Sequence, residues 1–221
     1  MTSIDIVSSF AGASSLMSRK VTYLDVIRHG EPEGGDVFRG RIDHRLTDNG
    51  RRQFRERLIR NPGAWQRVVS SPLARCHESA AEIASEGNLP IRVDERWAEI
   101  DYGDWEGVPV KDVMTGDQTH VRQLWEDPMN FCAPNGEPVP ALQARVLDAW
   151  LHALQEHSGE HLLVVTHGGV MRVLAQHLLS LAPEAMKRLG IPYAGMLRLQ
   201  VDEDETGEHW VTLIGMDGAE L

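Results

Sequence analysis

The stretch LDVIRHGEPEGG, residues 24–35, decides how the fold and the chemistry of this chain are read. Its apolar beginning predicts a buried strand, because a short run of apolar and β-branched residues is typical of one. The run ends on Arg28, His29 and Gly30. A guanidinium and an imidazole are therefore held at one strand end, with no bulky side chain directly after them.

Length and composition describe an ordinary globular protein with an acidic balance. The 221 residues favour one α/β domain over two, and 42% hydrophobic with 25% charged residues is usual for a chain with a proper core. The 33 acidic and 22 basic side chains leave a net charge of −11. Such a charge disfavours a nucleic acid or an anionic membrane as partner, since both require a basic surface. Any local group of arginines and histidines stands out against this background.

The cysteines and the first residues bear on compartment and domain limits. Cys76 and Cys132 are too few for a disulfide framework and lack a metal-type spacing, so we expect two free thiols in a cytoplasmic protein. The longest apolar run falls short of the roughly 20 residues that cross a membrane.

Residues 1–20 lack the basic start of a signal peptide and predict a loose extension, with Met17 as the natural start. The single domain is expected over 21–221.

Strands and helices alternate along this domain. Apolar and β-branched runs predict the strands, and segments of helical periodicity closed by Asn, Pro or Gly predict the helices. The alternation is typical of a layered α/β fold around a mainly parallel sheet. Residues 103–140 are rich in Gly, Pro, Asp and Trp, and we expect a long irregular excursion or lid there. The predicted strands are 21–27, 65–71, 91–93, 161–166, 196–201 and 209–215; the predicted helices are 46–60 with Thr47 as N-cap, 73–87, 141–157 and 168–181.

Three predicted strands end on residues of the same chemical kind. Arg28 and His29 follow the first strand, His167 follows strand 161–166 together with two glycines, and Arg75 opens the helix after strand 65–71. The carboxyl ends of parallel strands share one edge of a sheet, where ligands of α/β proteins bind. The sequence therefore predicts two histidines and two arginines at one rim.

A phosphate group is the ligand that best unites these residues. Guanidinium forks match phosphate oxygens, and glycine backbone at a helix N-terminus admits an anion. Phosphoryl transfer also needs a nucleophile, and a neutral imidazole can serve; His29 is the stronger candidate because it is rigidly placed between Arg28 and Gly30. The leaving alkoxide needs a proton from a carboxyl group. Candidates for that role are Glu95, Glu99, Asp101, Asp104 and Glu106.

Two other readings of the same residues stay open. His29 could be a hydrogen-bonded structural residue, with Arg28 paired to Glu31 or Asp25. Alternatively, His29, His167 and a carboxylate could hold Zn²⁺ or Mn²⁺. The positive charge of Arg28, directly beside His29, disfavours a metal ion at this position.

Five blocks of the sequence, in order and at similar spacings, resemble the histidine phosphatase superfamily, which contains phosphoglycerate mutases and related phosphatases. The blocks are IRHGE, GRIDHRLTDNGRRQ, SSPLARCHESA, AEIDYGDWEG and VVTHGGVMR, and the resemblance extends from about residue 21 to about residue 200. It implies a three-layer α/β/α sandwich of the phosphoglycerate mutase type. It also implies hydrolysis or transfer through a covalent phosphohistidine, with no metal and no organic cofactor.

The resemblance assigns roles to matching positions. It makes His29 the nucleophile and Glu99 the proton donor. It places Arg28, Arg75 and His167 around the phosphoryl oxygens, and Arg39, Gly40 and Gly168 on the substrate side. Ser79 stands where the family usually has Thr. The segment EPEGGDVFRG departs from the mutases, whose substrate contacts lie there.

Further features favour a phosphatase over a mutase and a small phosphorylated metabolite as substrate. YGDWEG has the phosphatase-like form, and WEDPMNFCAPNGEP resembles α-ribazole phosphatases. Residues 103–140 hold only Lys111 and Arg122, few cations for retaining a bisphosphate. The alternatives are a broad-specificity sugar-phosphate or nucleotide phosphatase, a mutase, and a non-catalytic phospho-ligand-binding protein. Trp97, Trp105 and Trp125 could line a lid over an aromatic substrate, with core packing expected for at least two of them.

Overall fold

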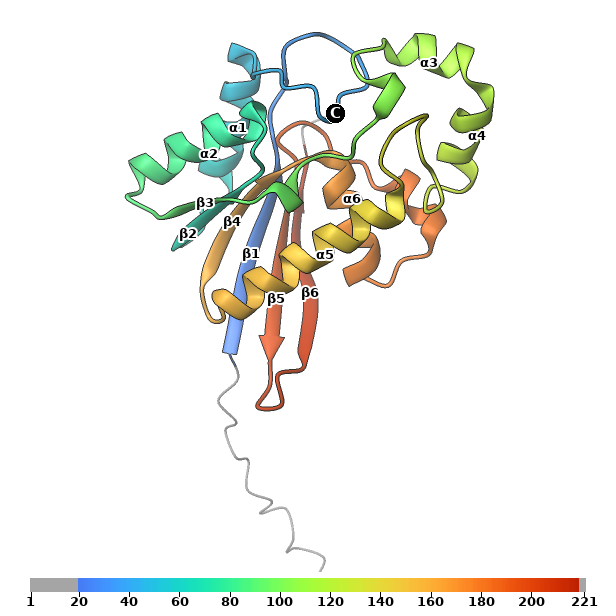
Figure 1. Ribbon diagram of the computed structural model, residues 1–221. Helices are drawn as coiled ribbons and strands as arrows, with labels where there is room; N and C mark the ends of the chain where they lie inside the picture. Colours follow the sequence, from blue (N-terminus) through green and yellow to red (C-terminus); the bar gives the residue numbers. More distant parts are fainter. Residues whose placement is uncertain (1–19, 219–221) are drawn as a thin grey trace, which may run out of the picture.

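A six-stranded mixed sheet forms the middle layer of the computed structural model, which describes residues 20–218 (Figure 1). The strand order is β3-β2-β4-β1-β5-β6. The pairs among the first four strands are parallel, whereas β5 and β6 pair antiparallel, so the prediction of a mainly parallel sheet with a C-terminal hairpin is confirmed. The predicted extension 1–20 lies outside the described residues except for Lys20. The strands are β1 (Lys20–Arg28), β2 (Arg67–Ser70), β3 (Ile91–Val93), β4 (His161–Thr166), β5 (Met196–Glu203) and β6 (His209–Asp217).

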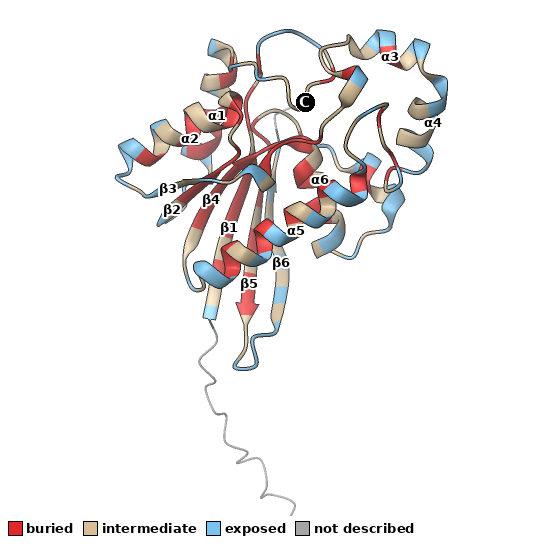
Figure 2. Ribbon diagram, in the orientation of Figure 1, coloured by how far each residue is buried: buried red, intermediate tan, exposed pale blue. Residues whose placement is uncertain are grey.

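Helices cover both faces of this sheet, which confirms the three-layer sandwich. Alternate residues of the central strands serve opposite layers, because strand side chains alternate in direction. Ile27 and Leu163 pack with the layer of α1 and α2, whereas Val26 and Leu162 pack with the layer of α5 and α6. Burial on both faces explains the continuous apolar runs of β1 and β4 (Figure 2). The helices are α1 (Asp48–Arg60), α2 (Ala74–Glu86), α5 (Val139–Glu156) and α6 (Gly168–Leu178).

Local sequence explains where these helices begin and end. The Thr47 side chain accepts a hydrogen bond from the backbone N–H of Gly50, which confirms the predicted N-cap of α1. Asn61 ends α1 and Gly87 ends α2. Helix α5 begins at Val139, with a proline in its first turn, where the missing N–H costs nothing.

The expectation of an irregular excursion over 103–140 is wrong in part. The segment contains a 3₁₀ turn, η2 (Gly103–Trp105), and two short helices, α3 (Val110–Gly116) and α4 (Gln118–Glu126). Asp117 caps α4 by accepting from the backbone N–H of His120. These helices are shorter than those that are stable alone, so their anchoring to the core decides their formation. Val113 of α3 lies in the core, and Val121 and Leu124 of α4 pack against it.

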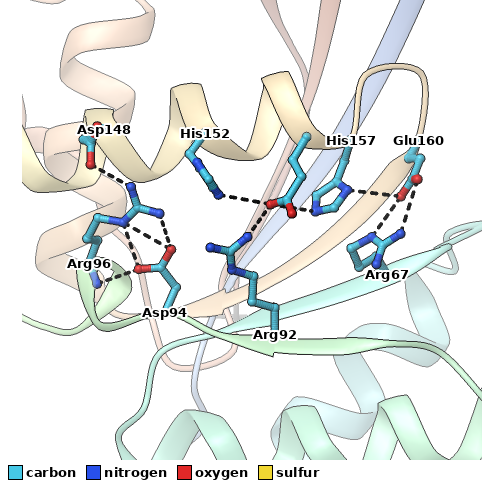
Figure 3. A network of polar contacts seen from close by, with 9 residues as sticks. Arg67, Arg92, Asp94, Arg96, Asp148, His152, His157 and Glu160 are labelled. Atoms are coloured by element: carbon cyan, nitrogen blue, oxygen red, sulfur yellow. Dashed lines mark hydrogen bonds and ion pairs between the residues drawn. The ribbon is translucent and has the colours of Figure 1, made fainter.

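Ion pairs fasten α5 to the edge of the sheet (Figure 3). Arg96, in the 3₁₀ turn η1 (Glu95–Trp97), binds Asp94 and also Asp148 of α5, and Arg92 of β3 binds Glu156 of α5. The network holds the backbone that leads toward Glu99 against α5. Among residues 20–218, no helix is long and apolar enough to cross a membrane.

Candidate active site

The three predicted strand ends meet as expected, with His29 at their centre. Strands β1 and β2 both pair parallel with β4, and the backbone N–H of His29 donates to the Thr166 carbonyl, 3.0 Å away. The ring centroids of His29 and His167 are 5.2 Å apart. Gly30 is required directly after His29, since a Cβ there would lie 1.9 Å from the carbonyl oxygen of Gly50. The close approach of α1 to β1 thus explains the R-H-G order.

Hydrogen bonding and charge set the state of the His29 ring. Nδ1 lies 2.7 Å from the carbonyl oxygen of Gly30. Because a carbonyl only accepts, Nδ1 carries the proton and Nε2 keeps its lone pair in the neutral ring. Burial, followed by the positive charges of Arg75 and Arg28, holds the pKa of His29 well below its usual value. The ring is therefore a neutral imidazole with a free Nε2 at neutral pH.

Two arginines flank this ring and retain unused donors. Arg75 is fully buried, and its terminal nitrogens donate to the carbonyls of Ile42 (2.9 Å) and Gly40 (2.7 Å). Arg28 donates to the Ile191 carbonyl at 2.7 Å. The Nε atoms of both arginines are buried with no hydrogen-bond partner among the described residues. An unpaired buried donor costs about 1–3 kcal/mol, which an oxyanion bound between the two would remove.

His167 is the N-cap residue of α6 and is fully buried. Its Nε2 lies 2.7 Å from the Oγ of Ser71, at the end of β2. Burial, and then the charge of Arg75, lowers the pKa of His167 well below its usual value. Gly168 is the first residue of α6, so its backbone lies at the positive end of that helix.

The structure separates the five candidate carboxyl groups. Glu99 is buried, and its Oε2 accepts from the N–H of Gly169, two residues after His167, at 3.0 Å. Glu95 and Asp104 are exposed. Asp101 accepts from the N–H of Gly103, and Glu106 binds backbone groups of residues 40–42. Glu99 is therefore the carboxyl group that the fold brings to the His29 cluster.

Two of the three predicted substrate-side residues, Arg39 and Gly40, lie in the loop after β1. Arg39 donates to the carbonyls of Glu33 and Gly35 and, through Nε, to the Nδ1 of His44. Gly40 is buried, and a Cβ there would lie 2.0 Å from the Ile100 carbonyl oxygen. Only glycine therefore fits at position 40, where the carbonyl is presented to Arg75.

Two contributors to the site were missed from the sequence. The Tyr193 ring lies under the Arg28 guanidinium, 4.3 Å from ring centroid to Cζ, and 5.8 Å from the His29 ring. Nothing in the segment IPYAG signals that role. Ser71, which binds His167, follows a strand in the same way as His29 does, and that position was its only signal.

The structure also bears on the other readings of the cluster. The proposed pairing of Arg28 with Asp25 or Glu31 is wrong: Asp25 binds Arg198, and Glu31 accepts from Thr47 and Asn49. Within residues 20–218 there is no group of three His, Cys, Asp or Glu side chains that could hold a metal ion.

A pocket of about 250 Å³ is lined by Ile100, which follows Glu99 in the chain, and by Gly169, whose N–H binds Glu99. Its wall is largely apolar and includes Tyr102, Trp125 and Phe131. Trp97 and Trp105 are buried in the core instead, so the expectation of core packing for two of the three tryptophans is confirmed. Arg172 and Lys187 are the cations in the wall among the described residues.

Comparison with known proteins identifies the family. The profile of the histidine phosphatase superfamily (branch 1) matches residues 24–212, and the chain belongs to that superfamily. It is an enzyme of the phosphatase type.

Named relatives and a solved structure support this assignment. Phosphoserine phosphatase 1 of Hydrogenobacter thermophilus is 30% identical over 68% of this chain and 73% of its own length. The adenosylcobalamin/alpha-ribazole phosphatase of Escherichia coli is 28% identical over 73% of this chain and 81% of its own. The structure of Bacillus stearothermophilus YhfR superposes with a TM-score of 0.78 at 27% identity, covering 88% of this chain and 96% of that one.

Proposed function

We propose that this phosphatase is a cytoplasmic, metal-independent phosphomonoester hydrolase that works through a phosphohistidine at His29. One observation carries the proposal: the neutral His29 ring, with Nε2 free, lies between two arginines whose buried Nε donors lack partners among the described residues. Phosphoryl transfer requires mainly a placed nucleophile and stabilisation of charge on the equatorial oxygens. Both requirements are met by this arrangement.

In the proposed mechanism, the reaction has two steps. His29 Nε2 attacks phosphorus, the bond from phosphorus to the ester oxygen breaks, and Glu99 gives its proton to the leaving alkoxide. Glu99, now a carboxylate, takes a proton from water, whose oxygen attacks the phosphohistidine and releases phosphate and neutral His29. Arg28, Arg75 and His167 hold the phosphoryl oxygens throughout, and the N-terminal backbone of α6 at Gly168 adds a favourable dipole. Arg39 and Gly40 border the substrate.

The pocket supports an aromatic or otherwise apolar leaving group. Gly169, whose N–H binds the proposed proton donor, is one of its lining residues, so the alcohol half of the ester would enter it. Tyr102, Trp125 and Phe131 offer ring faces to such a group. A benzimidazole nucleotide fits this chemistry, and a relative bears the name alpha-ribazole phosphatase. We therefore propose α-ribazole 5′-phosphate as substrate, with residues 103–140 as the lid over it.

A second candidate rests on the two cations in the pocket. Arg172 and Lys187 favour substrates with an additional anionic group, as a phosphorylated amino acid or acid sugar has. The phosphoserine phosphatase relative points in the same direction. A broad-specificity phosphatase would accept both kinds of ester, and a mutase would rearrange 3-phosphoglycerate without net release of phosphate.

The test is phosphate release, in EDTA, from α-ribazole 5′-phosphate, phosphoserine, 3-phosphoglycerate, sugar phosphates and nucleotides, with His29→Ala as the blank. A kcat/KM for α-ribazole 5′-phosphate about a hundredfold above the others, equal to about 2.7 kcal/mol, supports the first candidate. Preference for phosphoserine supports the second, and a flat profile indicates a general phosphatase. Inhibition by EDTA would revive a metal mechanism, and a fully inactive wild type would favour a binding protein.

A further inference from the structure

The carboxylate of Glu106 binds four backbone N–H groups from two separate segments. Oε1 accepts from Arg41 at 2.8 Å and from Tyr102 at 3.0 Å, and Oε2 accepts from Gly40 at 3.2 Å and Ile42 at 3.0 Å. A carboxylate has about four lone-pair positions, so these bonds use all of them. The Glu106 carboxylate therefore joins the loop after β1 to the segment that follows Glu99.

The loop bound by Glu106 is the same loop that binds Arg75. The N–H of Arg41 and the carbonyl of Gly40 belong to one peptide unit, which is planar. Glu106 accepts from that N–H, and the Nη2 of Arg75 donates to that carbonyl at 2.7 Å. One rigid peptide unit is thus held between an anion and a cation, with its dipole aligned to both. The Nη1 of Arg75 binds the next carbonyl of the loop, that of Ile42.

We infer that Glu106 is a positioning residue for phosphoryl transfer, acting on Arg75 through the Gly40–Arg41 peptide. This inference rests on the proposed function, in which Arg75 holds the phosphoryl oxygens. Two loop carbonyls occupy the ends of the Arg75 fork and leave its buried Nε for the oxyanion. Without Glu106, the loop can rotate these carbonyls, and Arg75 loses the orientation on which transition-state stabilisation depends.

Close packing limits how the loop can compensate. A Cβ at position 40 would lie 2.3 Å from Oε1 of Glu106 and 2.0 Å from the Ile100 carbonyl oxygen, so the loop backbone is in direct contact with both. Glu106 lies just after η2, and its side-chain hydrogen bonds within residues 20–218 go to backbone N–H groups of residues 40–42 and 102. Its effect on catalysis must therefore pass through the backbone segments that it binds, and coupling to Arg75 distinguishes the loop from the segment that follows Glu99.

The experiment is a double-mutant cycle that combines Glu106→Gln with Arg75→Lys. Gln keeps one acceptor oxygen but turns an NH₂ group toward backbone N–H groups, and Lys keeps the charge of Arg75 but loses the fork. With p-nitrophenyl phosphate, Glu106→Gln should lower kcat/KM by about 10- to 100-fold in the wild-type background, since charge-assisted hydrogen bonds are lost. In the Arg75→Lys background the further loss should be under about threefold, because coupled residues are not additive.

Glu86→Gln is the matched control, since it makes the same change at an exposed carboxylate, which pairs with Arg55 far from the loop after β1. It should leave kcat/KM and inorganic phosphate binding unchanged. If Glu106→Gln does not fold, as judged by circular dichroism, Glu106→Asp takes its place in the cycle. An equal loss in both backgrounds, or no loss at all, would overturn the role of Glu106.

Failure of the proposed function gives a different result. In that case wild-type protein shows no hydrolysis that His29→Ala abolishes. The cycle is then measured on the Kd of inorganic phosphate. The same non-additivity there supports Glu106 as a positioning residue for Arg75, and additivity overturns it.

Discussion

His29 owes its chemistry to its immediate neighbours Arg28 and Gly30 together with Arg75, which comes from a distant part of the chain. Its proton is placed on Nδ1 by the carbonyl of Gly30, while burial and two arginines lower its pKa. Glu99 shows the same dependence, because it reaches the cluster through the N–H of Gly169. Neither residue type is unusual; in the proposed mechanism, the combination of one lone pair, two guanidinium groups and one carboxyl group moves the phosphoryl group.

Glu99→Gln tests the proton donor directly. An alkyl phosphate, whose alkoxide needs a proton to leave, should lose about 10²- to 10⁴-fold in kcat/KM, whereas p-nitrophenyl phosphate should lose less than about tenfold. Steady-state kinetics on both esters provide the measurement. Glu95→Gln, at an exposed position nearby, is the control and should match wild type. Equal losses on the two esters would remove Glu99 from this role.

Helix α5 does more for the site than cover one face of the sheet. Its Arg145 donates to the carbonyls of Arg96, Ala98 and Glu99 at 2.7–3.0 Å. The same guanidinium forms an ion pair with Glu137 at 2.7 Å. This side chain, only 17% exposed, holds the backbone that carries Glu99. The ion pairs that α5 forms with Arg92 and Arg96 (Figure 3) are more exposed to solvent than the pair of Arg145 with Glu137.

Replacing Arg145 should therefore cost more than breaking a surface pair of the same helix. Arg145→Met leaves Glu137 and three carbonyls without their partner, and we expect a loss of about 3 kcal/mol in the free energy of unfolding. Glu156→Gln breaks the exposed pair with Arg92 and should cost less than about 1 kcal/mol. Urea unfolding measures both. Similar losses for the two variants would contradict this ranking.

The molecule as a whole keeps several histidines in the neutral form by burying them. Burial is the leading cause that lowers the pKa of His29, His167 and His157, and nearby arginines add to it. In the unfolded chain each returns to about 6.5. As the pH falls through that value, the unfolded state binds protons that the folded state does not, so stability declines.

The free energy of unfolding should therefore decrease between about pH 7 and pH 5, with up to about 1.4 kcal/mol per pH unit for each such histidine. Asp25 acts in a separate, lower range: burial raises its pKa, but hydrogen bonds from Arg198, His161 and Trp65 outweigh this and lower it, so its contribution is lost only in stronger acid. Urea unfolding from pH 5 to 8 gives the slope. His29→Gln should reduce the slope, and an unchanged slope for this variant would contradict the argument.

Short-range information in the sequence was sufficient for most of the fold. The apolar runs of β1 and β4, the Thr47 cap and the ends of α1 and α2 all depend on neighbouring residues, and the structure has them where they were expected. The meeting of three strand ends also followed, because parallel strands point the same way. Helices α3 and α4 were missed, since their formation depends on anchoring to a distant core.

The sequence by itself determined the layered fold, the family and the residues that converge on one rim, because hydrophobic period, capping and motif spacing are local. Only the tertiary structure decided that Glu99, of five candidate carboxyl groups, reaches Gly169 beside the His29 cluster. It also decided that Tyr193 contacts Arg28, that Ser71 contacts His167, and that Glu106 binds the loop behind Arg75. These contacts join residues 65 to 165 positions apart, and contact geometry over such separations exists only once the chain has packed.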